Sequence, residues 1–121
     1  MADNREILSR SQAGLRFIAL MTLFNKQEGA RLRQFIADYF TEDALAEQDA
    51  ESRAQDFEAL YARTQKLRVY QVLGIGENQA IVVVEAQADG RYYAHSIQVE
   101  KDYPHRVMIY VQQPIETESA D

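Results

Sequence analysis

The sequence predicts an α+β fold in which N-terminal helices pack on a curved, four-stranded antiparallel sheet, as in a cone-like roll. Apolar residues recur at helical spacing over positions 5–65, whereas positions 66–114 are rich in β-branched residues between turn signals. Helices followed by strands favour α+β over a parallel βαβ sheet. The 121 residues suit a single domain, 1–115, and we expect the acidic tail, 116–121, to be disordered.

Three amphipathic helices are expected before the sheet. The first spans 5–26 and ends in an apolar stripe with i, i+3, i+4, i+7 spacing, formed by Phe17, Leu20, Met21 and Phe24. The second spans 28–40 and the third spans 50–65. Thr41 resembles a helix N-cap, since its hydroxyl can accept a hydrogen bond from a free backbone amide. A short helical turn is therefore expected between the second and third helices.

The sheet is predicted as a meander of four strands, at 66–73, 80–86, 92–99 and 107–114. Asp89-Gly90 suits a two-residue loop, because both positions of such a loop need positive φ. That loop pairs Val82 with Ile97 and places His95 on the same, more apolar face. We expect this face to be the one that the helices cover.

The last turn, centred on Tyr103, extends this arrangement to the fourth strand. It places Ile109 and Val111 on the core side and leaves several apolar residues on the opposite face. An exposed apolar patch of that kind usually marks an association surface, so we expect a homodimer. The candidate interface residues are Ile81, Val83, Tyr92, Ala94, Met108 and Tyr110.

Composition excludes several classes of site. The chain has no cysteine, which excludes disulfides, thiolate metal sites and a cysteine nucleophile, and its net charge of −6 argues against a nucleic-acid surface. His95 and His105 lack the spacing of a metal site, and Gly74-Ile75-Gly76 precedes a strand and not the helix of a phosphate loop. We expect no cofactor, no metal and no membrane contact. A secretory signal is not evident, so a cytoplasmic location is expected.

His95 is the most suggestive single residue for a site. A histidine on an apolar face can act as an acid or base in a pocket, or it can be a core residue satisfied by one hydrogen bond. Four tyrosines, each with an apolar ring and an orienting hydroxyl, are candidates to line a ligand pocket or to pack in the core with the hydroxyl at its edge. They are Tyr39, Tyr61, Tyr70 and Tyr93.

The order of parts resembles a known family. The segments that carry the likeness are Leu20-Met21-Thr22-Leu23-Phe24-Asn25, Leu32-Arg33-Gln34-Phe35-Ile36-Ala37, Phe57-Glu58-Ala59-Leu60-Tyr61 and Tyr103-Pro104-His105-Arg106-Val107. Together they resemble nuclear-transport-factor-two-like domains (SnoaL-like and ketosteroid-isomerase-like proteins), including the small version found beside some serine hydrolases. The likeness covers about 14–114. It implies a pocket between sheet and helices and, frequently, a homodimer formed through the outer sheet face.

One fold serves unrelated functions in this family, which includes ketosteroid isomerases, scytalone-dehydratase-like enzymes, polyketide cyclases and members that only bind or scaffold. The chain does not match the catalytic acid and base pattern of those enzymes. We therefore expect a non-catalytic small-ligand-binding or scaffolding domain. The alternatives are a cofactor-independent isomerase, dehydratase or cyclase acting on a small hydrophobic substrate, and an accessory module for a hydrolase.

Overall fold

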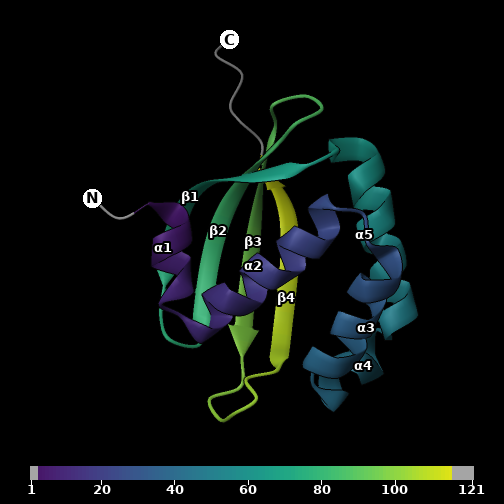
Figure 1. Cartoon of the computed structure of the whole chain (residues 1–121), viewed down its shortest axis with the longest axis vertical. Helices are drawn as coiled ribbons and strands as arrows, with labels where there is room; N and C mark the ends of the chain where they lie inside the picture. The colour runs from purple at the N-terminus through teal and green to yellow at the C-terminus, as the bar shows by residue number, and fades with distance from the viewer. Residues whose placement is uncertain (1–2, 116–121) are drawn as a thin grey trace.

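The computed structural model describes residues 3–115 and shows an α+β fold (Figure 1). In this part of the chain the helices are α1 (Asn4–Ser9), α2 (Gln12–Asn25), α3 (Gly29–Tyr39), α4 (Glu42–Glu47) and α5 (Ala50–Thr64). The strands are β1 (Leu67–Ile75), β2 (Gln79–Ala86), β3 (Tyr92–Val99) and β4 (Val107–Ile115). They form one antiparallel sheet in the order β1-β2-β3-β4. The predicted fold class is confirmed, and the predicted acidic tail, 116–121, lies outside the described residues.

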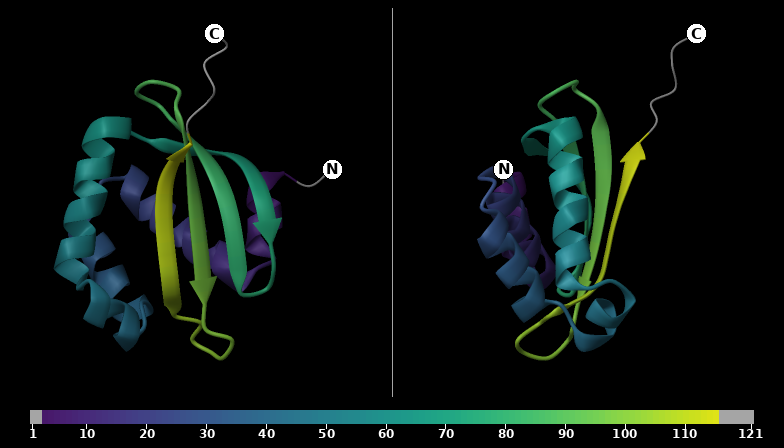
Figure 2. Two further views of the ribbon diagram at one scale, coloured as in Figure 1. Left: turned by 180° about the vertical axis from the view of Figure 1, so that it is seen from behind. Right: turned by 90° about the vertical axis from the view of Figure 1, so that its right-hand side faces the viewer.

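The helices gather on one face of the sheet. In Figure 1, α2 crosses that face diagonally, while α3 and α5 pack together beside β4. Seen edge-on in Figure 2, the other face of the sheet carries no helix of the described chain. We call the covered face the inner face and the other the outer face. None of the helices in residues 3–115 has the length and apolar character that crossing a membrane requires.

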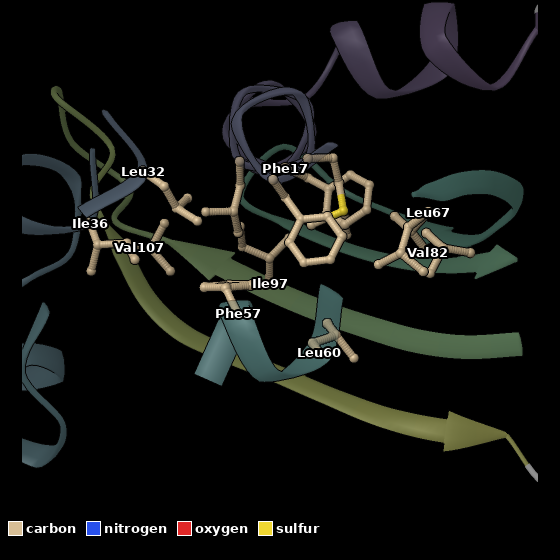
Figure 3. Close-up of a cluster of buried hydrophobic side chains, with 14 of the residues drawn as sticks. Phe17, Leu32, Ile36, Phe57, Leu60, Leu67, Val82, Ile97 and Val107 are labelled. Carbon is tan, nitrogen blue, oxygen red and sulfur yellow. The ribbon is translucent and has the colours of Figure 1, made fainter. Parts of the chain in front are cut away.

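The core lies between α2 and the inner face, and Figure 3 shows members of it from both layers. The apolar stripe predicted at the end of the first helix is buried, which confirms that prediction; its members are Phe17, Leu20, Met21 and Phe24. They pack with Leu32 and Ile36 of α3, with Phe57 and Leu60 of α5, and with inner-face residues of the strands.

The prediction of one long first helix was wrong, because the chain breaks at Ser11 into α1 and α2. The Ser11 hydroxyl accepts from the Gly14 amide at 3.1 Å and donates to the Gly76 carbonyl at 2.6 Å. Gly14 allows α1 to fold back closely, since a Cβ at this position would lie 2.1 Å from the Leu8 carbonyl oxygen. A serine cap and a contact with the distant β1–β2 loop therefore end the first helix.

The other helix boundaries follow their sequence signals. The Thr41 hydroxyl accepts from the Ala44 amide at 3.1 Å and starts α4, which confirms the predicted short helix. The Asp49 carboxylate caps α5 in the same way through the Ser52 amide, at 2.8 Å. These side chains satisfy amides that a helix start leaves without partners.

The pairing of β2 with β3 differs from the predicted one, although the faces are the same. Val82 lies opposite His95 and not opposite Ile97. The loop is longer than two residues, because Gln87 and Ala88 donate their amides to two carbonyls at the junction of α5 and β1, those of Lys66 and Thr64 respectively. Each partner moves by two positions, which preserves the alternation of side chains.

The facing of β4 was predicted wrongly beyond its first residue. Val99 pairs with Val107, but Gln98 pairs with Ile109, so the ladder contains a bulge at this step. Val107 is also held from its other side, where its carbonyl accepts from the Thr41 amide at 2.9 Å. The bulge reverses the remaining side chains of β4. Ile109 and Val111 lie on the outer face, and Tyr110, proposed above for an interface, lies on the inner face.

Candidate functional site

Three polar side chains lie next to one another on the inner face, where the rest of the surface is apolar. His95 of β3 is the cross-strand partner of Gln112 of β4, and Tyr110 lies two residues before Gln112 on the same face. The bulge in β4 places both β4 residues there. Buried polar groups need hydrogen-bond partners, and apolar packing does not require polar residues at these three positions. We therefore consider this trio as part of a candidate site.

His95 is fully buried and its side chain is held on two sides. Its Nδ1 is hydrogen-bonded to the Tyr110 hydroxyl, and its ring meets Phe17 edge-on with the centroids 5.7 Å apart. Burial lowers the pKa of His95 to about 4, because the charged imidazolium would lose its hydration. The ring is therefore neutral near pH 7. It does not reach any of the surface hollows described below.

Two nitrogens of the trio lack partners within residues 3–115. Nε2 of His95 and Nε2 of Gln112 are both buried and make no hydrogen bond there. The Tyr110 hydroxyl is buried as well, and burial raises the pKa of Tyr110. A buried amide nitrogen without an acceptor costs about 1–3 kcal/mol. Of the two side chains with such a nitrogen, Gln112 is the one among the lining residues of the cavity described next.

This cavity lies between α5 and β4 and has a volume of about 170 Å³. Tyr110 and Gln112 line it from the strand, and Phe57 and Leu60 form an apolar wall on α5. Its remaining lining residues are polar: Gln48, Arg53 and Asp56. Apolar walls with a few converging polar groups are typical of small-molecule sites.

Arg53 is held firmly at this cavity. Its Nε donates to the Gln48 carbonyl and its Nη2 to the Ala44 carbonyl, both at 2.8 Å, and its guanidinium lies 5.0 Å from the centre of the Phe40 ring. Arg53 forms no ion pair in the described part of the chain. Burial lowers its pKa, although the carboxylates of Glu47 and Asp56 act in the opposite direction.

The structure does not bring the predicted pocket residues together. His95 is in the core, and Tyr61 lines a separate hollow of about 460 Å³ between the α2–α3 turn and α5. Tyr39 is on α3, and the centre of its ring lies 4.4 Å from the guanidinium carbon of Arg16. Tyr70 is exposed on the outer face, where its ring packs against that of Tyr92.

Tyr93, the fifth predicted pocket residue, is buried on the inner face of β3 near the β2–β3 loop. The larger hollow beside Tyr61 has a mainly apolar wall. Its Arg33 Nε makes no hydrogen bond within residues 3–115, but it lies 2.6 Å from the Glu51 carboxylate, so the charge of Arg33 is already paired. Gln112 has neither a hydrogen bond nor an ion partner there, which makes its cavity the better candidate in spite of its smaller volume.

The outer face is the second candidate site. Ile81, Val83, Tyr92 and Ala94, which were predicted as interface residues, lie on this face. The bulge adds Ile109, Val111 and Ile115 of β4, all of them exposed. Met108 is exposed at the bulge, and Arg68 pairs with Glu85 across the strands on the same face.

Comparison of the chain with protein-family models, with curated proteins and with solved structures finds no match. The resemblance to nuclear-transport-factor-two-like domains stays a prediction that rests on the residues quoted above.

Proposed function

We propose that this chain is a non-catalytic small-ligand-binding domain whose site is the cavity between α5 and β4. The observation that supports this proposal is the side chain of Gln112, which is among the residues that line the cavity and whose buried Nε2 has no acceptor among the described residues. A ligand that brings an acceptor removes the cost of that donor. A cavity of this volume takes a ligand of about six heavy atoms, since benzene fits an engineered cavity of ~150 Å³.

Binding is favoured over catalysis by the placement of His95 and Tyr110. His95 lines neither of the two hollows described above, and its lowered pKa keeps it neutral near pH 7. The Tyr110 hydroxyl is hydrogen-bonded to His95, and burial makes its ionisation harder. The isomerase, dehydratase and cyclase alternatives require a group that moves a proton at the substrate. Neither of these two residues suits that role.

A titration followed by nitrogen-15 NMR tests this proposal with two probes of six heavy atoms, butyrate and butyramide. The side-chain NH₂ signals of Gln112 are expected to move saturably with at least one probe. The signals of Gln113 serve as the internal control, because this neighbouring side chain is exposed on the outer face. The proposal is rejected if neither probe moves the Gln112 signals, or if Gln112 and Gln113 respond alike.

The second candidate function is scaffolding as a homodimer through the outer face. It is favoured by the exposed apolar side chains of this face, which the helices leave uncovered (Figure 2). A second copy suits the face, because a two-fold interface must be complementary to itself and Arg68 and Glu85 already neutralise each other within one copy. Light scattering at micromolar concentration is expected to give the mass of a dimer. The mass of a monomer would reject this candidate.

A further inference from the structure

We propose that the ligand of the α5–β4 cavity is a small monocarboxylate, held by the guanidinium of Arg53 and the side-chain amide of Gln112. This inference rests on the proposed function and adds the chemical class of the ligand. It is carried by two side chains with nitrogen donors that line the same small cavity, Arg53, which is cationic, and Gln112, which is neutral.

The guanidinium is placed for an anion. Its Nε and Nη2 are committed to the carbonyls of Gln48 and Ala44, which fixes the plane of the group and leaves Nη1 for a further acceptor. Within residues 3–115 no carboxylate forms an ion pair with Arg53, although the group is partly buried. Arginine matches the planar geometry of a carboxylate, so an organic acid suits this site better than a neutral ligand.

The neutral donor, the side-chain amide of Gln112, belongs to β4, whereas Arg53 belongs to α5. Gln112 Nε2 is buried and lacks an acceptor in the described part of the chain. A carboxylate has two oxygens and about four acceptor positions, so one group can meet Arg53 and Gln112 together. A single carbonyl oxygen offers fewer acceptor positions and no charge. Burial also lowers the pKa of Arg53, while the carboxylates of Glu47 and Asp56 act in the opposite direction, so a bound anion would add to the charges that already oppose the loss of hydration.

The remaining lining sets the size and the charge of the acid. Phe57 and Leu60 offer an apolar wall to a short hydrocarbon part. Asp56 is exposed, and its carboxylate accepts from the Gln48 side chain at 2.7 Å, which keeps a negative charge in the lining. A second carboxylate on the ligand would be repelled there. The site therefore selects a single negative charge on about six heavy atoms.

Butyrate and butyramide test this class directly, since they share their size and differ in charge. NMR titration of the full chain is expected to give at least tenfold tighter binding of butyrate. Arg53→Gln should remove this preference, so that the two probes bind equally. Arg63→Gln, which changes an exposed arginine on the same helix, is the matched control and should keep it.

The possible outcomes separate the two proposals. Equal binding of butyrate and butyramide to the native protein overturns the carboxylate class and leaves the ligand-binding function standing. A preference for butyrate that survives in Arg53→Gln also overturns the inference. If neither probe binds, both proposals fail. Because Arg53 also joins α4 to α5, its variant can lose stability; the ratio of the two affinities in the native protein then decides.

Discussion

The two faces of the sheet depart in opposite ways from the usual rule that apolar side chains are buried and polar side chains are exposed. The inner face, under α2, holds His95, Tyr110 and Gln112 within an otherwise apolar core. The outer face, which no described helix covers, exposes apolar side chains such as Ile109 and Val111. Buried polar groups and exposed apolar patches are both informative because packing does not require them. Each face therefore points to a different binding role.

The largest expected effect is a loss of folding stability when the core on the inner face is disrupted. Phe17 is fully buried and touches the ring of His95, so Phe17→Ala should lower the free energy of unfolding by about 3–5 kcal/mol. Leu15→Ala on the same helix is the control, since Leu15 is 42% exposed and should change stability by about 0.5 kcal/mol or less. Urea denaturation measures both. Similar losses for the two variants would contradict the assignment of the inner face as the core.

The next effect concerns pH and the polar part of the inner face. The folded pKa of His95, about 4, lies below its unfolded value near 6.5, so the unfolded state binds the proton more tightly. Its contribution to stability is complete above pH 6.5 and is lost as the pH falls towards 4, for a total of about 3 kcal/mol.

Two measurements check this pH dependence. NMR titration of the His95 ring protons should give a pKa near 4, and a value near 6.5 would contradict the account. The difference in unfolding free energy between the native protein and His95→Gln should shrink between pH 7 and pH 4.5.

A smaller effect is expected from a substitution on the outer face, which should weaken dimer formation and leave folding stability unchanged. Val111→Glu puts a charge into the exposed apolar face and should weaken dimer formation at least tenfold, or about 1.4 kcal/mol. Leu15→Glu is the matched control, because Leu15 has nearly the same exposure (42% against 41%) but lies on α2. Light scattering should show a folded monomer for the first variant and a dimer for the second. Equal masses for the two variants would remove the outer face from the account.

Local signals predicted most of the fold. The stripe from Phe17 to Phe24, the Thr41 cap and the alternation in β2 and β3 each depend on neighbours in the sequence, and the structure has them. The break at Ser11 could not be predicted in this way, because the carbonyl that its hydroxyl binds belongs to Gly76. The β2–β3 loop is longer than predicted for the same reason, since its amides bind carbonyls at the α5–β1 junction.

The candidate site was missed because of a single bulge. Strict alternation from Val107 puts Tyr110 and Gln112 on the outer face, and only the step to Ile109 reverses them. The contact between Thr41 and Val107 that accompanies the bulge joins residues far apart in the sequence. Arg53 was also missed, since an arginine on an amphipathic helix gives no sign that its partners are carbonyls. His95 was correctly placed on the inner face by the alternation alone.

The most direct test of the ligand site compares two adjacent glutamines of β4. Gln112 lies on the inner face at the cavity, and Gln113 lies on the outer face. Leucine has nearly the volume of glutamine but no hydrogen-bond donor, so Gln112→Leu should weaken butyrate binding at least tenfold while Gln113→Leu leaves it unchanged. NMR titration of both variants measures the two dissociation constants. Equal affinities in the two variants would contradict the assignment of the cavity between α5 and β4 as the binding site.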